Sequence, residues 1–365
     1  MLKIIDFIKS NENWREILSN APYHLTISDD DDFTILKYSQ IDSDMNIDIV
    51  RECRGLIIDK DYHPVCIPFF KFANYGESYA DKIDWNTAVV EEKIDGSLIK
   101  VWNYKGRWIV STNGTIFAEN ANLGEKENNK NNDGYSNFAQ LFHAAIIKYE
   151  LSLDTLNPCY TYMFELCSQY NRVVTPFSEI KLFHIGTRNN DTLKELEIDI
   201  GIPKPQTFNC NSLSDLIEVA SKLKYCDEGY VVKDSAYHRI KVKSPSYVAA
   251  HHLVSNMNDR KLLELIRRNE TDEFLVYFPE YKSFVENLTA KIVKFIDYID
   301  MTIAMEFARV SFETRKEFAT VAIKTTYPAF FFSWYDEKVA TASEWLWSFS
   351  NEKIEELLGR LDEQN

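Results

Sequence analysis

The chain has 365 residues, of which 45% are hydrophobic and 14% are aromatic, and its formal net charge is −15. This hydrophobic content excludes a disordered polypeptide, and the length predicts two domains with a large buried core. This negative charge excludes a protein whose whole surface attracts polyanions. A nucleic acid would have to bind at a local basic surface, and its binding should depend on salt concentration.

The N-terminal residues 1–9 interrupt their apolar side chains with charged ones, which predicts an amphipathic helix and not a signal peptide. The longest uncharged apolar stretch, 327–335, is far too short to cross a bilayer. Six cysteines occur without a Cys-x-x-Cys pair, which favours reduced, buried thiols, and no spacing typical of a zinc site is present. We therefore expect a cytoplasmic protein without a membrane partner.

Two early strand signals each carry a basic residue. Arg54 and Gly55 lead into a β-branched apolar run at 56–58, and Lys71 lies within the aromatic segment 69–75. Residues 89–98 then place Lys93 two residues before an Asp-Gly turn, at the end of another β-branched run. A lysine attacks phosphorus only as the free amine, so this site would have to lower its pKa or hold a cation nearby.

The pattern Lys-x-Asp-Gly is expected by chance about 0.1 times in a chain of this length, given average residue usage. A surface hairpin with a solvated lysine therefore remains the alternative for Lys93. The polar, Asn-rich segment 125–134 that follows predicts a loop, either a plain insertion or a lid that closes over substrate.

Two later segments combine a carboxylate with a strand pattern. Glu165 stands alone among aromatic and apolar residues at 160–166, where a buried carboxylate is costly unless it meets a cation or hydrogen-bond donors. Glu228 precedes Gly229 at the start of an apolar run, where a glycine lets a ligand approach the backbone. Ordinary buried ion pairs are the alternative for both carboxylates.

The segment 238–244 has strand periodicity, which sends Ile240 and Val242 to one face and Lys241 and Lys243 to the other. Two cations at i and i+2 can clamp a phosphate. A solvated edge strand guarded by lysines would give the same pattern.

The pattern changes after Pro245, because glycine almost vanishes and helical spacing takes over. The helical positions are Val285, Leu288, Ile292, Ile296 and Ile299, and then Ile354, Leu357, Leu358 and Leu361. Pro328 interrupts this region, and we interpret the aromatic residues at 330–334, 345 and 347 as packing core rather than a base-stacking platform. We predict an α+β protein, with an antiparallel-sheet domain at 1–246 and an all-helical domain at 247–365.

The order of these motifs resembles that of the covalent nucleotidyltransferases, and within them the phage RNA ligase 1 family. The shared motifs are Arg54-Gly55, Lys71-Phe72, Lys93-x-Asp95-Gly96-Ser97, Phe164-Glu165, Glu228-Gly229 and Lys241-x-Lys243. Features specific to the phage family are Glu52-Cys53-Arg54-Gly55, Asn171-Arg172-Val173-Val174, and Tyr247-Val248 followed by His251 or His252. The similarity covers roughly residues 38–252.

The resemblance implies an ATP-dependent RNA ligase that works through a lysyl-AMP on Lys93. The AMP would pass to an RNA 5′-phosphate, and a 3′-hydroxyl would displace it to seal the strand. The implied catalytic residues are Lys93, Asp95, Lys241 and Lys243. The implied nucleotide-binding residues are Tyr38, Arg54, Lys71, Lys93, Glu165, Glu228, Lys241 and Lys243. Glu165 and Glu228 would also hold Mg²⁺, for which Mn²⁺ can substitute, since carboxylates suit a hard cation.

The expected partner is RNA with 5′-phosphate and 3′-hydroxyl ends, with tRNA repair as a plausible setting, and a monomer is favoured. If the chain comes from a phage, it would work in the host cytoplasm. The basic candidates for RNA contact are Arg239, Lys241 and Lys243, and then Arg260, Lys261, Arg267 and Arg268, although a solvated helix face is the simpler interpretation of the last four.

One position departs from the family pattern, because Asn113 stands where the family has a lysine before a glycine. An amide can still form hydrogen bonds with the nucleotide, but a charge is lost. The alternatives are a DNA ligase, a capping-type nucleotidyltransferase, or a catalytically silent protein that binds RNA ends. The C-terminal region lacks the strand-rich pattern of the OB-fold expected in a DNA ligase.

Overall fold

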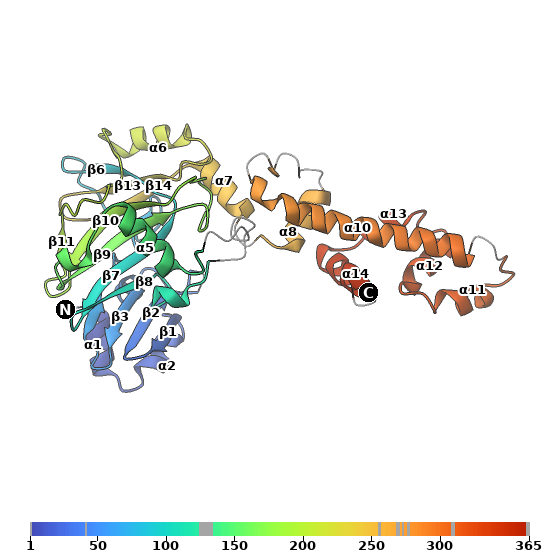
Figure 1. Cartoon of the computed structure of the whole chain (residues 1–365), viewed down its shortest axis with the longest axis horizontal. Coiled ribbons are helices and arrows are strands. Elements are labelled where there is room, and N and C mark those ends of the chain that lie inside the picture. Colours follow the sequence, from blue (N-terminus) through green and yellow to red (C-terminus); the bar gives the residue numbers. More distant parts are fainter. Residues whose placement is uncertain are drawn as a thin grey trace. The chain divides into compact units, whose positions relative to one another are not determined.

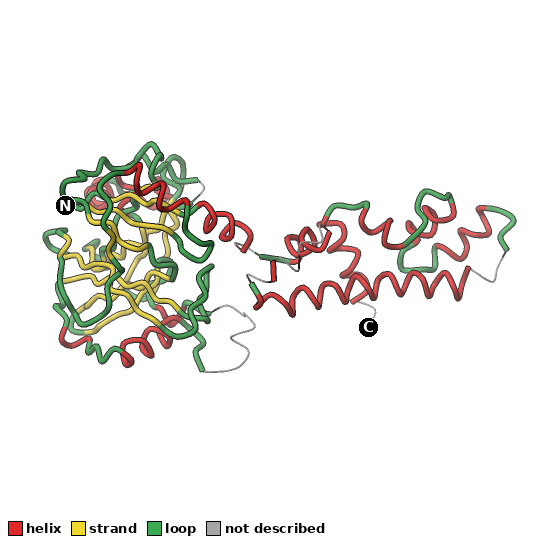
Figure 2. The backbone as a smooth tube through the Cα atoms, turned by 90° about the horizontal axis from the view of Figure 1, so that it is seen from above, coloured by secondary structure: helices red, strands yellow, loops and turns green. Residues whose placement is uncertain are grey.

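The computed structural model describes residues 2–40, 42–123, 134–254, 257–267, 271, 274–275, 278–307 and 311–362. The chain divides into two compact units, Met1–Ser255 and Asn256–Asn365. Figure 2 shows the strands in the first unit and only helices and loops in the described part of the second. The helix α7 (Pro245–Val254) belongs to the first unit. The predicted loop 125–134 lies outside the described residues except for Gly134.

The first sheet is antiparallel and carries the N-terminal helices on one face. Its strands, in spatial order, are β1 (Leu25–Asp30), β2 (Phe33–Tyr38), β3 (Arg54–Asp59) and β4 (Pro64–Cys66). The helices are α1 (Lys3–Ser10), α2 (Trp14–Ser19) and α3 (Asp48–Glu52). The amphipathic helix predicted for 1–9 is confirmed, because Ile4, Ile5 and Ile8 are buried against this sheet.

The second sheet is also antiparallel, and it packs between the first sheet and a helix. Its strands, in spatial order, are β11 (Glu195–Leu196), β10 (Lys181–Asn189), β9 (Tyr160–Cys167), β7 (Ser97–Tyr104) and β8 (Arg107–Thr112). Strand alternation turns Tyr162 and Phe164 of β9 toward α5 (Phe138–Lys148), so Glu165 points to the opposite face. Trp102 of β7 packs against Phe33 of the first sheet.

The third sheet mixes strand directions. Its order is β12 (Thr207–Phe208), β6 (Val89–Glu92), β13 (Gly229–Lys233), β14 (Arg239–Lys243) and β5 (Ala73–Asn74). All neighbours are antiparallel except β14 and β5, which pair in parallel. The helix α6 (Leu213–Ser221) covers one face and lies over β13 and β14 (Figure 1). Two short 3₁₀ helices complete the unit, η1 (Ala118–Asn120) and η2 (Leu153–Thr155).

The second unit is helical throughout its described residues. Its elements are α8 (Asp259–Arg267), η3 (Pro279–Tyr281), α10 (Lys282–Thr302), the π-helical turn η4 (Ile303–Phe307), α11 (Arg315–Ala322), α12 (Pro328–Tyr335), α13 (Ala342–Trp347) and α14 (Asn351–Asp362). Pro328 interrupts the helical region as predicted, by occupying the first turn of α12. Of the aromatic residues interpreted as packing core, Phe330, Phe331 and Trp345 are buried, whereas Phe332, Trp334 and Trp347 are only half-buried.

The α+β prediction is therefore confirmed, and the six cysteines are free thiols. The prediction that all six are buried is wrong for Cys159, which is exposed because it follows Pro158 in the turn before β9. It also overstates the burial of Cys210 and Cys226, which are half-buried. Among the described residues, no helix is both long and apolar enough to cross a membrane.

Candidate active site

A cavity of about 420 Å³ gathers most of the basic residues that the motifs single out. We call it the lysine cavity. Its lining residues are Gln40, Arg54, Phe69, Lys71, Phe72, Asn74, Glu91, Glu92, Lys93, Ile94, Glu165, Ile185, Pro205, Val231, Arg239, Lys241, Lys243 and His251. These residues come from all three sheets and from the segment 69–72, so motifs far apart in the sequence share one concave site.

Strand alternation explains the two lysines on β14. Ile240 and Val242 pack beneath α6, which turns Lys241 and Lys243 to the opposite face and into the cavity. The strand lies between β13 and β5. The alternative of a solvated edge strand is therefore excluded, and the predicted alternation is confirmed.

A carboxylate joins the lysine at the end of β6 to the second lysine of β14. Glu228 Oε2 lies 2.6 Å from Lys93 Nζ, and Glu228 Oε1 lies 3.0 Å from Lys243 Nζ. The Glu228 side chain is only 5% exposed, whereas those of Lys93 and Lys243 are 21% and 31% exposed. Lys93 is itself fixed by its backbone N–H, which donates to the Gly229 carbonyl at 2.9 Å. The surface-hairpin alternative for Lys93 does not agree with this arrangement.

Glu165 lies on the inner face of β9, beside this cluster. Burial raises the pKa of Glu165 to about 7, with the nearby Glu228 charge acting in the same direction and Lys93 opposing it. A carboxyl group with a pKa near neutrality gains most from an incoming cation, because the cation compensates for the water that burial removes.

The pKa of Lys241 is shifted in the opposite direction, downward. Burial lowers the pKa of Lys241 to about 6, and the positive charges of Lys71, Arg54 and Lys93 lower it further. The site thus crowds cations together at a cost, which an anionic ligand would relieve.

Arg54 and Lys71 complete the basic wall and contact aromatic rings. The Arg54 guanidinium lies 5.4 Å from the centre of the Phe72 ring, and the Lys71 amine lies 5.1 Å from the centre of the Tyr38 ring. Tyr38 is only 3% exposed and packs behind Lys71, away from the cavity wall. The end of β2 turns its ring into the core beneath α1–α3, and its position beside a nucleotide stays a prediction.

Asp95, in the turn after Lys93, accepts hydrogen bonds from two backbone N–H groups and one hydroxyl. Its Oδ2 accepts the backbone N–H groups of Val174 and Thr175 at 2.9 and 2.7 Å, and its Oδ1 accepts the Tyr247 hydroxyl at 2.7 Å. The carboxylate therefore ties the Asp-Gly turn to α7 and to the loop after β9. These contacts fix the turn that follows Lys93, and the catalytic role implied for Asp95 stays a prediction.

Several other basic candidates have intramolecular partners. Arg239 is buried and forms a two-pronged ion pair with Glu195, so it is not a free surface for RNA. Arg172 Nε donates to the Val174 carbonyl at 2.9 Å. Arg260 pairs with Glu352 and Glu355, and Arg267 donates to the Phe349 carbonyl. Arg268 lies outside the described residues.

Sequence reasoning missed Lys100, the one fully buried lysine among the described residues. Its amine donates to the Gly55 carbonyl, and burial lowers the pKa of Lys100 to about 8. Gly55 has φ +76°, and a Cβ there would lie 2.9 Å from the Lys100 amine and 2.7 Å from the Asn113 carbonyl oxygen. The signal was present, because Lys100 interrupts the apolar run from Leu98 to Trp102.

Two carboxylates near Lys93 are candidates to hold a hard divalent cation. Glu165 lines the lysine cavity, Glu228 contacts Lys93, and desolvation raises the pKa of Glu165 to about 7. Two carboxylates fit Mg²⁺, which keeps several waters and takes further ligands from a substrate phosphate. Within the described part of the chain, three possible metal ligands also lie close together at Asp59, Asp61 and His63, near the β3–β4 turn. Asp59 is buried, but Asp61 and His63 are exposed.

A sequence model of the phage RNA ligase 1 family, described as RNA ligase, matches residues 52–247. A relative named "Putative bifunctional polynucleotide kinase/RNA ligase", from Autographa californica nuclear polyhedrosis virus, is 32% identical over 279 residues, covering 70% of this chain and 39% of the relative. An RNA ligase from Rhodothermus phage RM378 is 24% identical over 288 residues, covering 61% of this chain and 65% of the relative. The chain thus spans less than two thirds of either relative.

Among solved structures, an archaeal ATP-dependent RNA ligase is similar to this chain with a TM-score of 0.42 and 14% identity. The match covers 78% of this chain and 73% of the archaeal one. A likeness this loose identifies neither the reaction nor the substrate. The family match agrees with the motif order, and its range contains every predicted site residue except Tyr38.

Proposed function

The chain belongs to the phage RNA ligase 1 family, and on that premise we propose that it joins RNA ends in an ATP-dependent reaction through a lysyl-AMP on Lys93. The observation that carries this proposal is the lysine cavity. It brings Lys93 together with a basic wall and the partly buried carboxylate of Glu165, and Lys93 also pairs with the buried carboxylate of Glu228. A basic wall around a lysine suits a reaction in which negative charge develops on phosphate oxygens.

In the first step, Lys93 Nζ attacks the α-phosphorus of ATP. A P–N bond forms as the bond to the β-phosphate oxygen breaks, and pyrophosphate leaves with that electron pair. The amine must first lose its proton and its ion pair with Glu228, because only the free amine is a nucleophile. Glu228 Oε2, at 2.6 Å, is placed to accept that proton before passing it to water.

Lys241 and Lys243 are proposed to hold the α-phosphate, with Arg54 and Lys71 along the remaining phosphates. A bound phosphate would add negative charge beside Lys241 and raise its pKa, so Lys241 should become protonated as ATP binds. Glu165 and Glu228 would hold Mg²⁺, or Mn²⁺ in its place. When bound, this ion supplies charge neutralisation on the phosphate oxygens.

The later steps reuse the same cations. An RNA 5′-phosphate oxygen attacks the lysyl-AMP phosphorus, a P–O bond replaces the P–N bond, and Lys93 is released as an amine. A 3′-hydroxyl then attacks the RNA 5′-phosphorus, and AMP leaves as the strand is sealed. We propose RNA with 5′-phosphate and 3′-hydroxyl ends as the substrate, with broken tRNA as one candidate, and a monomer as the working form.

The test is covalent labelling followed by product analysis. Protein incubated with α-³²P-ATP and Mg²⁺ should retain label after denaturation, and Lys93→Ala should retain none. Lys82→Ala, an exposed lysine outside the lysine cavity, is the matched control and should label as the wild type does. Labelled wild type should then join matched RNA ends faster than DNA ends. Label that persists in Lys93→Ala would overturn the mechanism, and faster joining of DNA would overturn the substrate.

A further inference from the structure

A second cavity, of about 530 Å³, lies beside the lysine cavity, and the two share Phe69, Lys71, Phe72 and Arg239 in their walls. We call it the aromatic–cationic pocket. The rest of its lining is Phe70, Asp81, Arg188, Leu193, Lys194, Glu195, Ala236, Tyr237 and His238. Its volume is in the range that holds a nucleotide-sized ligand. No step proposed above uses it.

The wall of this pocket is positively charged in an otherwise acidic chain. Four cationic side chains line it, against the two carboxylates of Asp81 and Glu195. Glu195 is held between two guanidinium groups, at 2.8 Å from Arg188 and at 2.8 and 2.6 Å from Arg239. One carboxylate shared by two buried arginines leaves an excess of positive charge, which favours an anionic ligand.

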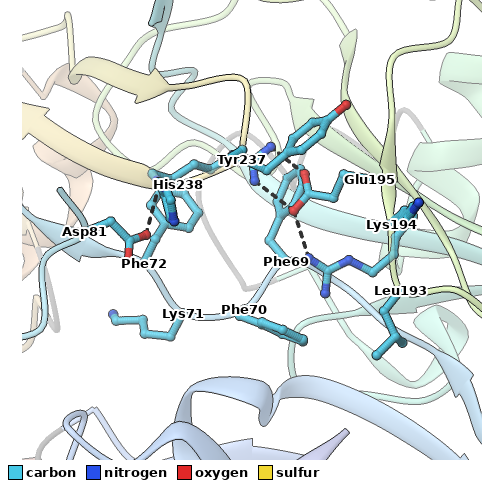
Figure 3. A pocket seen from close by; sticks show the side chains of 13 residues that line it. Phe69, Phe70, Lys71, Phe72, Asp81, Leu193, Lys194, Glu195, Tyr237 and His238 are labelled. Atoms are coloured by element: carbon cyan, nitrogen blue, oxygen red, sulfur yellow. Dashed lines mark hydrogen bonds and ion pairs between the residues drawn. The ribbon is translucent and has the colours of Figure 1, made fainter. Parts of the chain in front are cut away.

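Aromatic rings alternate with these cations. The Arg188 guanidinium lies 4.3 Å from the centre of the Phe70 ring, and the Arg239 guanidinium lies 4.3 Å from that of Phe69. Figure 3 shows Tyr237 on one side of the Glu195 carboxylate and Phe70 on the other. Aromatic side chains interleaved with cations are typical of sites that bind single-stranded nucleic acid, where bases stack and phosphates meet positive charge.

The backbone that presents two of these side chains is in an unfavourable conformation. Leu193, in the turn after β10, has φ +62°, and Tyr237, in the turn before β14, has φ +65°. Large side chains are rare in this region, which glycine, asparagine and aspartate enter more easily. Both side chains line the same pocket. Such conformations concentrate at functional sites, where the side chain is needed despite its cost.

We propose that the aromatic–cationic pocket binds a nucleotide of the RNA strand, next to the end that is being joined. This inference rests on the proposed ligase function and adds a position for the substrate. Tyr237 would stack on the base, and Lys194 would contact a phosphate, since Lys194 is exposed and makes no ion pair within the described part of the chain. Lys71, which lines both cavities, would lie where the strand passes from this pocket to the adenylate.

The experiment separates RNA binding from adenylate chemistry. Binding of a fluorescent 5′-phosphorylated RNA oligonucleotide is measured by anisotropy on a Lys93→Ala background, where no covalent step can occur. Adding Tyr237→Ala should weaken binding by about five- to a hundredfold, the range for losing one base stack. Lys194→Glu should also weaken binding and should lower the slope of log affinity against log salt by about one. Lys9→Glu, an exposed lysine on α1, makes the same charge change outside the pocket and should change neither quantity.

The same substitutions in the otherwise wild-type chain should leave the rate of lysyl-AMP formation unchanged and slow the transfer of AMP to RNA. Unchanged RNA affinity in both pocket variants would overturn the inference, as would a raised KM for ATP, which would make the pocket part of the nucleotide site. If the wild type forms no lysyl-AMP, the proposed function fails. The anisotropy result would still show whether the pocket binds RNA.

Discussion

The two units of this chain bury different kinds of side chain. Every buried polar or charged residue within the described part of the chain belongs to the first unit, including Lys100, Arg188, Glu228 and Arg239. The described buried residues of the second unit are all hydrophobic, and many are aromatic. Burying charge costs free energy unless it is compensated, whereas burying aromatic rings stabilises the fold directly. The difference indicates that the charged site of the first unit lowers the stability of that unit. The fold of the second unit is specified by the packing of hydrophobic side chains.

The largest effect expected on stability comes from the packed unit. Phe330→Ala removes a fully buried ring that packs against Phe331 and Trp345, and should destabilise the second unit by about 3–5 kcal/mol. Thermal unfolding should show this loss, while lysyl-AMP formation at a permissive temperature keeps its wild-type rate. The matched variant Phe142→Ala, in the core between α5 and β9, should instead lower both stability and labelling. Equal labelling losses in the two variants would contradict the division of roles.

The next largest effect should come from a buried cation of the site. Lys241→Met keeps most of the side-chain volume and should slow lysyl-AMP formation by about 10²–10³-fold, the usual cost of losing one charged group that stabilises a transition state. Single-turnover labelling at saturating ATP measures this rate. Lys222→Met, on the exposed lysine that follows α6, is the control and should have no effect.

The pKa of Lys241 also predicts a proton linkage. With a pKa of about 6, Lys241 is mostly neutral at pH 7.5, and bound phosphate should make it take up a proton. Calorimetry of ATP binding without metal, in buffers of different ionisation enthalpy, should show this uptake at pH 7.5. The uptake should fade as the pH falls through 6, because the amine is then already charged, and it should be absent in Lys241→Met. Binding without uptake in the wild type would show that Lys241 does not meet the phosphate.

These tests also show what the sequence could and could not predict. The lysine pair of β14 and the inward-facing Glu165 were predictable, because strand periodicity fixes faces locally. The pairing of Glu228 with Lys93 joins residues 135 positions apart, and that of Lys100 with Gly55 spans 45 positions. Such contacts depend on how sheets stack, which local patterns do not encode. Arg239 shares its face with Lys241, yet Glu195 neutralises it from another sheet.

A smaller effect is expected from Lys100, whose hydrogen bond holds the Arg54–Gly55 junction. Lys100→Met should raise the KM for ATP by about tenfold, the cost of roughly one charged hydrogen bond, by loosening Arg54. The lowered pKa of Lys100, about 8, also predicts how the stability of the fold depends on pH. Between pH 8 and the unfolded lysine value the unfolded state binds more protons, so wild-type stability should rise with pH relative to Lys100→Met. If the free energies of unfolding of the two proteins changed with pH in parallel, the lowered pKa of Lys100 would be contradicted.

The smallest effect is expected at a surface ion pair of the second unit. Arg260 of α8 contacts Glu355 and Glu352 of α14, and its side chain is 51% exposed. Exposed pairs contribute about 0–1 kcal/mol, because water screens the charges and two long side chains lose freedom. Arg260→Ala should therefore leave the midpoint of chemical unfolding close to its wild-type value and leave labelling unchanged. A loss as large as that of Phe330→Ala would show that the second unit, like the first, depends on charge, and the contrast between the two units would no longer hold.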